Sequence, residues 1–225
     1  MSGHTEADGP FTRARRRMVD EQLIARGIRD ARVLATMAQV PRHTFVEGES
    51  AERSYGDHAL ASAQGQTISQ PWIVARMLEL ATLAPDQCVL EIGTGTGYQT
   101  ALLARLVRLV VSVERLGALV TSARARLDRL GVTNAVLVHG DGSLGWREHA
   151  PYARVLVAAA APRVPGALLE QIEDGGSLVI PVGGALNQHL EVWRRRGERW
   201  TSERHGECRF VPLIGADAWR SDSSA

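Results

Sequence analysis

The sequence predicts an α/β fold with a doubly wound, mostly parallel sheet. Between residues 87 and 182, short apolar runs alternate with segments of helical periodicity, and this order builds right-handed βαβ units. The first run, residues 89–92, carries apolar side chains on both sides of its pleat, as strands buried on both faces do. Acidic residues lie at or near the ends of the first three runs, at Glu91, Glu114 and Asp141, where ligands bind in such folds.

The N-terminal part predicts two short helices behind a disordered tail. Residues 1–14 are polar and poor in large apolar groups, which is typical of disorder. From Met18 apolar residues recur at helical spacing until Gly27, which ends the helix. Asp30 is placed to cap a second helix that stops before Pro41.

Residues 41–70 hold no long periodic pattern. A loop of this length inside a compact domain is usually functional or disordered. Its last part mixes amides, hydroxyls, glycine and proline, so we expect an ordered binding loop. Pro71 suits the first turn of the helix that follows, and the inner face of that helix is apolar: Ile73, Val74, Met77, Leu78 and Ala81.

The alternating section and the C-terminal part supply the strands. The apolar runs predict parallel strands at residues 87–92, 109–114, 135–138, 155–159 and 177–182. A short helix is expected around residues 166–172, before the last of these strands. Alternating stretches at residues 190–193 and 209–211 predict antiparallel strands that close an edge of the sheet. The last ten residues, 216–225, are expected to form a frayed tail.

Composition indicates a soluble globular protein of 225 residues, large enough for one α/β domain, at residues 15–215. The formal net charge of +1 gives no electrostatic case for a nucleic-acid or membrane partner. Cys88 and Cys208 form neither a disulfide framework nor a metal spacing, and the histidines form no metal pair. No signal peptide or membrane span is visible, so we expect a cytoplasmic protein.

A glycine-rich turn follows the first strand. Gly93, Gly95 and Gly97 alternate with other residues, which differs from the G-x-G-x-x-G spacing of dinucleotide-binding turns. Glu91 precedes them, and its carboxylate would repel a pyrophosphate but suit a ligand that carries an ammonium group. The turn resembles the first motif of class I methyltransferases, which bind S-adenosylmethionine. The alternative is an ordinary turn that closes a buried strand.

Two further acids suggest how such a cofactor would be held. Glu114 lies where nucleotide-binding folds place an acid against ribose hydroxyls, and a carboxylate can accept from two hydroxyls. Asp141 is a candidate for the adenine amine. The alternatives are a solvent-facing Glu114 and a turn-forming Asp141 within Gly140-Asp141-Gly142.

The sequence disfavours two classes of methyl-transfer reaction. Residues 158–162, after the fourth strand, are four alanines and a proline, not the Asn/Asp-Pro-Pro-Tyr that holds the amino group of a base. DNA adenine methylation is therefore not expected. A metal-dependent catechol-type enzyme is disfavoured because no metal pair of histidines is present.

The loop before the helix at Pro71 reads Gly65-Gln66-Thr67-Ile68-Ser69-Gln70-Pro71. Further motifs accompany it along the chain: Met18-Val19, Gln22-Leu23, Arg26-Gly27-Ile28, Val40-Pro41-Arg42, Phe45-Val46, residues 89–98, Ser112-Val113-Glu114-Arg115, Gly140-Asp141-Gly142, Gly145-Trp146 and Arg209-Phe210-Val211-Pro212-Leu213. The loop resembles the hallmark loop of the protein-L-isoaspartate O-methyltransferases, and the other motifs stand in that family's order, so the resemblance runs from about residue 18 to residue 215.

The resemblance implies a fold, an activity and roles for residues. The fold would be a Rossmann-like seven-stranded sheet with an N-terminal helical cap at residues 15–84, a cofactor-binding core at 85–184 and C-terminal strands at 185–215. The activity would be metal-free methyl transfer from S-adenosyl-L-methionine to L-isoaspartyl residues of damaged proteins, by a monomer. Ser69 would be the active-site serine. Substrate-binding residues would be Gln66, Thr67, Ile68, Val211, Pro212 and Leu213; cofactor-binding residues would be Glu91, Gly93, Thr94, Gly95, Gly97, Tyr98, Glu114, Arg115, Asp141 and Gly142.

The chain departs from the family pattern at three places. Residues 61–63 are Ala-Ser-Ala where the family usually has Pro-Ile-Gly, Ala153 replaces a common aspartate, and only alanines follow the fourth strand. Three alternatives therefore stay open. Thr67 and Ser69 could merely cap the next helix, the enzyme could serve one dedicated partner peptide, or the chain could be a non-catalytic binding protein.

Overall fold

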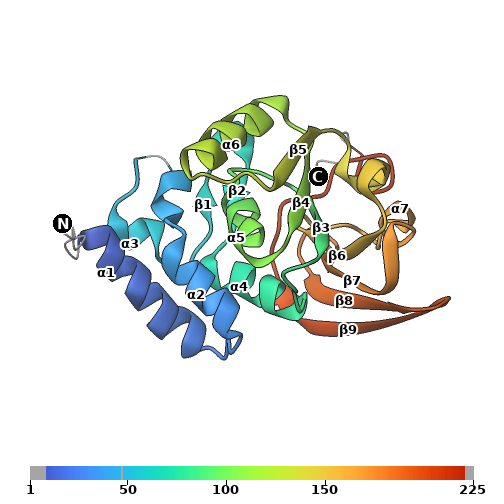
Figure 1. Ribbon diagram of the computed structural model, residues 1–225, viewed down its shortest axis with the longest axis horizontal. Coiled ribbons are helices and arrows are strands. Elements are labelled where there is room, and N and C mark those ends of the chain that lie inside the picture. Colours follow the sequence, from blue (N-terminus) through green and yellow to red (C-terminus); the bar gives the residue numbers. More distant parts are fainter. Residues whose placement is uncertain (1–8, 47, 221–225) are drawn as a thin grey trace.

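The computed structural model describes residues 9–46 and 48–220. Seven strands form one sheet in the order β5-β4-β3-β6-β7-β8-β9 (Figure 1). The pairs from β5 to β7 are parallel, and β8 and β9 add antiparallel strands. The predicted doubly wound, mostly parallel sheet is thereby confirmed. The strands are β3 (Cys88–Ile92), β4 (Leu109–Glu114), β5 (Ala135–His139), β6 (Tyr152–Val157), β7 (Ile172–Gly183), β8 (Gln188–Arg196) and β9 (Arg199–Cys208).

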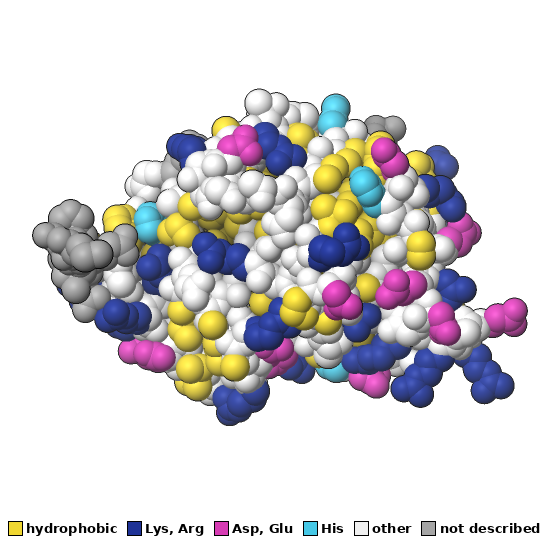
Figure 2. Space-filling model, viewed as in Figure 1, with side chains coloured by type: hydrophobic (Ala, Val, Ile, Leu, Met, Phe, Trp, Pro, Cys, Tyr) yellow, Lys and Arg dark blue, Asp and Glu magenta, His cyan; other side chains and the backbone are white. Residues whose placement is uncertain are grey.

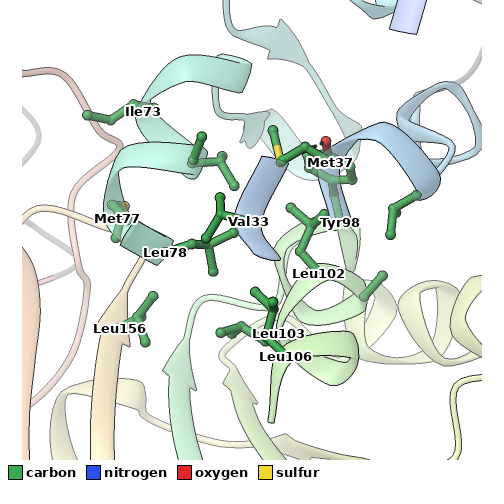
Figure 3. Close-up of a cluster of buried hydrophobic side chains, with 14 of the residues drawn as sticks. Val33, Met37, Ile73, Met77, Leu78, Tyr98, Leu102, Leu103, Leu106 and Leu156 are labelled. Carbon is green, nitrogen blue, oxygen red and sulfur yellow. Dashed lines mark hydrogen bonds between the residues drawn. The ribbon is translucent and has the colours of Figure 1, made fainter. Parts of the chain in front are cut away.

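Buried apolar layers cover both faces of the sheet. On β3, Val89 belongs to one layer, while Leu90 and Ile92 belong to the other, as the two-residue period of a strand requires. The first layer holds α2 (Ala31–Gln39), α4 (Pro71–Leu80) and α5 (Tyr98–Leu106). Figure 3 shows its centre, with these labelled side chains: Val33, Met37, Ile73, Met77, Leu78, Tyr98, Leu102, Leu103, Leu106 and Leu156.

The N-terminal helix begins earlier than predicted. Helix α1 (Pro10–Arg17) continues directly into η1 (Met18–Ile24), so the predicted disordered tail is wrong for residues 10–14. Pro10 starts the helix because its fixed φ suits a first turn, and Ala14 is only 4% exposed. Residues 1–8 lie outside the described part of the chain.

Other helix boundaries follow the predicted signals. Gly27 has a φ of 94° and ends η1, with the Ile28 N–H donating to the Leu23 carbonyl at 3.0 Å. Asp30 caps α2, because its side chain accepts from the backbone N–H groups of Arg32 and Val33. Helix α6 (Gly117–Arg129) follows β4, and α7 (Gly166–Leu169) is shorter than expected.

The long loop before α4 is ordered, as predicted. It contains η2 (Arg42–Phe45), α3 (Ala51–Ser54), and a hairpin of β1 (Leu60–Ala61) and β2 (Thr67–Ile68), with η3 (Ala63–Gly65) at its turn. Leu60 pairs with Ile68, and Ala61 pairs with Thr67. The hairpin therefore forms despite the Ala-Ser-Ala departure at residues 61–63. Pro71 occupies the first turn of α4.

The C-terminal part differs from the prediction in two ways. The outer antiparallel strand is β9, and residues 209–211 are not part of any sheet strand. Residues 216–220, predicted as a tail, are held in place: the Ala216 N–H donates to Asp141 at 2.7 Å, and Asp217 pairs with Arg163. The cause is a long-range contact that has no local sequence signal. Residues 221–225 lie outside the described part of the chain.

The surface carries charges of both signs. Figure 2 shows basic and acidic side chains interspersed over one face, several of them near the projecting β8–β9 end. Such mixed charge is ordinary for a protein whose net charge is +1. Among the helices of the described residues, none has the length and apolar character that a membrane span requires.

Candidate active site

A cavity of about 340 Å³ lies at the carboxyl ends of β3, β4 and β6, where ligands bind in open α/β sheets. Its walls come from the turn after β3, from the 65–69 loop and from residues 211–214. The structure therefore brings together segments that are far apart in the sequence. The predicted site residues that line it are Gln66, Thr67, Ile68, Ser69, Gly93, Thr94, Gly95, Tyr98, Glu114, Arg115, Gly142, Val211, Pro212 and Leu213.

The glycine turn has a backbone conformation with positive φ at each of its three glycines. Gly93, Gly95 and Gly97 have φ values of 91°, 53° and 92°, in the left-handed region that glycine adopts without strain. Gly93 and Gly95 line the cavity, but Gly97 does not. Gly97 instead packs against α6, because a Cβ there would lie 3.3 Å from the Cβ of Ala123. Gly97 therefore has a packing role, and its predicted contact with the cofactor stays a prediction.

Glu114 closes the floor of the cavity between β3 and β4. Its Oε2 accepts from the Gly95 N–H at 3.0 Å, and its Oε1 accepts from the Leu116 N–H at 2.9 Å. The carboxylate is only 8% exposed and lines the cavity, so it is not the solvent-facing group of the alternative interpretation. Each oxygen keeps a further lone pair for a ligand hydroxyl.

Glu91 does not reach the cavity, which corrects the prediction that it contacts the cofactor directly. It lies inside β3 on the same face as Val89, it is fully buried, and it does not line the cavity. Its Oε2 accepts from the hydroxyls of Ser112 and Thr100. Burial raises the pKa of Glu91 to about 7, although hydrogen bonds from Ser112, Thr100 and Gln99 act to lower it.

Asp141 is also outside the cavity wall, in contrast to the predicted adenine contact. Its Oδ1 accepts from the backbone N–H and the hydroxyl of Ser143, at 2.9 and 2.7 Å. Its Oδ2 accepts from the Ala216 N–H. The turn-forming alternative describes Asp141 better, since it caps η4 (Gly142–Leu144) and fastens the C-terminal segment to the sheet.

Asp141→Asn is expected to loosen that segment. The amide NH₂ would replace one acceptor oxygen and face an N–H donor, which costs about 1–3 kcal/mol. We expect the thermal midpoint to fall by several degrees, measured by circular dichroism. Asp128→Asn, at an exposed position on α6, is the matched control. Equal thermal midpoints for the two variants would contradict the role of Asp141 in holding the C-terminal segment against the sheet.

The 65–69 loop forms a second wall of the cavity. Gln64 and Gly65 have φ values of 59° and 67°, which reverse the chain so that the following residues enter the cavity wall. Thr67 and Ser69 both line the cavity. The N-cap residue of α4 is Gln70, and it makes no side-chain capping bond. The hydroxyls of Thr67 and Ser69 make no capping bond either within the described chain, which disfavours the capping alternative.

The third wall is held by backbone pairing. The Ala160 N–H donates to the Val211 carbonyl, and the Leu213 N–H donates to the Ala160 carbonyl, each at 2.8 Å. These bonds place residues 211–214 beside the end of β6. The wall is apolar, since Ala158, Ala159 and these residues contribute mainly carbon. Ala158 and Ala159, which belong to the alanine run that departs from the family pattern after β6, therefore lie in the cavity wall.

Several lining residues had no local sequence signal. The most informative is Gln99, a buried residue in the first turn of α5 that lines the cavity and whose side chain also acts on the carboxylate of Glu91, lowering its pKa. Its helical spacing indicated nothing beyond a helix position. The other unpredicted lining residues are Gly65, Val74, Ile92, Thr96, Val113, Leu116, Ala158, Ala159 and Ile214.

The polar side chains at the cavity are hydroxyls, amides, the carboxylate of Glu114 and the guanidinium of Arg115. Within the described part of the chain, no three His, Cys, Asp or Glu side chains gather as a metal site. Arg115 is an exposed guanidinium at the rim. A ligand with ribose-type hydroxyls and an anionic group would find complementary partners here: Glu114 for the hydroxyls, and backbone amides of the turn and Arg115 for the anionic group.

Comparison with known sequences gives one consistent result. Residues 14–218 match the family model "Protein-L-isoaspartate(D-aspartate) O-methyltransferase (PCMT)". A protein-L-isoaspartate O-methyltransferase of Methanoregula boonei is 50% identical over 214 residues, covering 94% of this chain and 99% of its own length. A second, from Pelobacter propionicus, is 53% identical over 204 residues, covering 90% of this chain and 91% of its own.

Comparison with solved structures agrees. A protein-L-isoaspartate O-methyltransferase structure superposes with a TM-score of 0.83 at 28% identity, covering 91% of this chain and 67% of that one. A Plasmodium falciparum structure, solved in complex with S-adenosyl-L-homocysteine, gives a TM-score of 0.78 at 24% identity, with 90% and 99% coverage. At that identity, the second likeness concerns the fold alone.

Proposed function

Because the chain belongs to the protein-L-isoaspartate(D-aspartate) O-methyltransferase family, we propose that its cavity transfers a methyl group from S-adenosyl-L-methionine to the α-carboxylate of L-isoaspartyl residues in damaged proteins. The observation that carries the proposal is the meeting of the glycine turn with the 65–69 loop in one cavity. The turn supplies a cofactor cradle, and the loop supplies hydroxyls for an acceptor.

The residues present fit the cofactor. Glu114 would accept from its ribose hydroxyls, and Gly93 and Gly95 would let the backbone approach it closely. Tyr98, Arg115 and Gly142 complete this side of the cavity. When bound, S-adenosyl-L-methionine supplies a methyl group on a positively charged sulfur.

The acceptor side requires little acid–base chemistry. A carboxylate with a pKa near ~4 is already ionised at neutral pH, so no general base is needed. The chain must orient the carboxylate and exclude water. We assign the orientation to the hydroxyls of Ser69 and Thr67, beside Gln66 and Ile68. The apolar residues Val211, Pro212 and Leu213 would line the peptide cleft and keep water out.

Methylation converts the isoaspartyl α-carboxylate into a methyl ester, whose carbonyl carbon is electrophilic. In the family's chemistry the backbone amide nitrogen of the following residue then attacks this carbonyl, methanol leaves and a succinimide forms, and hydrolysis of the succinimide returns some normal aspartate. The partners are therefore isoaspartyl-containing proteins and peptides. We further infer a cytoplasmic monomer that binds neither nucleic acid nor membrane, which the net charge of +1 supports.

A paired peptide assay tests the function. Labelled S-adenosyl-L-methionine is supplied with an isoaspartyl peptide or with the matching aspartyl peptide. We expect methyl ester on the first and little on the second, because the loop must place an α-carboxylate that only the isoaspartyl linkage leaves free. Equal labelling would contradict the repair activity. Absent labelling, together with calorimetry showing no cofactor binding, would favour a non-catalytic protein.

A further inference from the structure

The side chain of Gln188 holds the backbone of the third cavity wall at the point where that segment leaves the sheet. The Phe210 N–H donates to the Oε1 of Gln188 at 2.7 Å, and the Nε2 of Gln188 donates to the Phe210 carbonyl at 3.2 Å. Both residues are buried. Neither of them lines the cavity, but Val211, which follows Phe210, does. Gln188 therefore acts on the wall from outside the cavity.

The register of β8 and β9 explains why a side chain is needed at this point. Gln188 is the first residue of β8 and pairs with Cys208, the last residue of β9. Continued by two residues, this antiparallel register would place Leu186 opposite Phe210. Leu186 instead lies in the exposed turn before β8, and among the described residues no backbone group bonds to that of Phe210. The amide of Gln188 replaces the missing strand, because it presents one donor and one acceptor as a peptide group does.

The wall segment is thereby held from two sides. Backbone bonds to Ala160 fix Val211 and Leu213 beside the end of β6. Gln188 fixes the preceding residue, Phe210, at the start of β8. Without the amide, two buried backbone groups of Phe210 would lose their partners, which is costly for buried polar groups. We expect the segment to shift until these groups reach water or new partners, and the cavity wall to shift with it.

We propose that Gln188 is a positioning residue for the acceptor peptide: its side-chain amide takes the place of a strand and sets the position of the apolar wall at residues 211–213. The inference rests on the proposed function, which assigns that wall to the peptide cleft. Gln188 does not reach the cavity, so it contacts neither the cofactor nor the acceptor carboxylate. Its loss should weaken peptide binding and leave the transfer step and the cofactor largely unaffected.

Steady-state kinetics with an isoaspartyl peptide tests the proposal. Gln188→Leu keeps about the size of the side chain but removes its donor and its acceptor. We expect the KM for the peptide to rise about tenfold, which is the order of effect of an ordinary pair of hydrogen bonds. The kcat at saturating peptide and the Kd for S-adenosyl-L-homocysteine should each stay within about threefold of wild type, because Gln188 contacts neither reactant.

Gln188→Glu supplies a readout that general damage to the fold would not give. A protonated carboxyl group offers the same donor and acceptor as the amide, whereas a carboxylate only accepts and would place a negative charge against the Phe210 carbonyl. Burial raises the pKa of a carboxyl group, so acid should restore the donor. We expect the ratio of wild-type to variant kcat/KM to fall from about tenfold at pH 8 to about twofold or less at roughly pH 5.5, where the acceptor carboxylate is still ionised.

The comparison is made as a ratio because other groups near this position also titrate. His189 follows Gln188 on β8, and Glu207 and Cys208 lie opposite on β9. These residues are common to wild type and variant, so their titration cancels in the ratio.

Asn187→Glu is the matched control. Asn187 is exposed and does not line the cavity, so its variant adds a carboxyl group beside Gln188 and leaves the Gln188 amide in place. Its kcat/KM should match that of wild type at both pH values.

The proposal is wrong if the ratio for Gln188→Glu does not change with pH. It is also wrong if Gln188→Leu leaves the peptide KM unchanged, or weakens the cofactor as much as the peptide. Should Gln188→Leu fail to fold, the pH profile of Gln188→Glu decides. None of these results touches the proposed function, which the paired peptide assay on the wild-type protein tests separately.

Discussion

Ser69→Ala is expected to lower kcat for isoaspartyl methylation about a hundredfold, with the Kd for S-adenosyl-L-methionine unchanged within about twofold. Ser69 lines the cavity as part of the 65–69 loop, together with the glycine turn. A hydrogen bond to an ionised acceptor contributes about 1.5–3 kcal/mol, and loss of orientation adds to the effect because transfer needs an aligned carboxylate. Single-turnover kinetics and calorimetry measure the two quantities.

Ser62→Ala is the matched control. Ser62 belongs to the same hairpin but does not line the cavity, and its backbone N–H donates to the Gln66 carbonyl at 2.8 Å, a bond that the substitution preserves. We expect near-wild-type kinetics for it. A large increase in the cofactor Kd of Ser69→Ala would contradict the acceptor-side role and would place the serine against the cofactor.

Glu114→Gln is expected to show the opposite pattern: about a hundredfold weaker cofactor binding, with a much smaller change of kcat at saturating cofactor. Both oxygens of Glu114 accept from backbone N–H groups, those of Gly95 and Leu116. A glutamine amide would turn one acceptor into a donor that faces an N–H, and it would remove the charge that binds hydroxyls strongly. Calorimetry with S-adenosyl-L-homocysteine gives the affinity.

Glu198→Gln provides the comparison for the charge change. Glu198 is exposed in the turn between β8 and β9 and does not line the cavity, so its variant should bind as wild type does. Thermal midpoints of both variants should be recorded, because the turn after β3 depends on Glu114. Unchanged affinity in a folded Glu114→Gln variant would remove Glu114 from the cofactor site.

The fold was predictable where burial leaves a period in the sequence. The inner face of α4 and the core of α5 carry apolar residues at helical spacing, and both helices formed there. Strand β9 shows the limit. Most of its side chains are exposed, so it has no apolar signature, and it is held by backbone pairing with β8. Pairing of that kind depends on a partner and not on composition.

The site was predictable to the level of its segments. The spacing of the glycines and the hallmark loop identified two walls of the cavity, and residues 211–213 identified the third. Gln99 was not found, because a glutamine in a helix has no distinctive pattern. It lines the cavity and also acts on the carboxylate of Glu91, which only a folded chain can show.

The order of the βαβ units, the glycine positions of the turn after β3 and the family could be inferred from the sequence alone. Local spacing and residue type are enough to specify these features. The tertiary structure decided what each acid does. Glu91 lies within β3, so the pleat of the strand turns its side chain away from the cavity. The hydroxyls of Ser112 and Thr100 donate hydrogen bonds to its carboxylate there. The Asp141 carboxylate accepts a hydrogen bond from the backbone N–H of Ala216, 75 residues further along the chain. Only Glu114 of the three lines the cavity. The direction of a side chain depends on where a strand ends and on what packs against it, and neither is encoded locally.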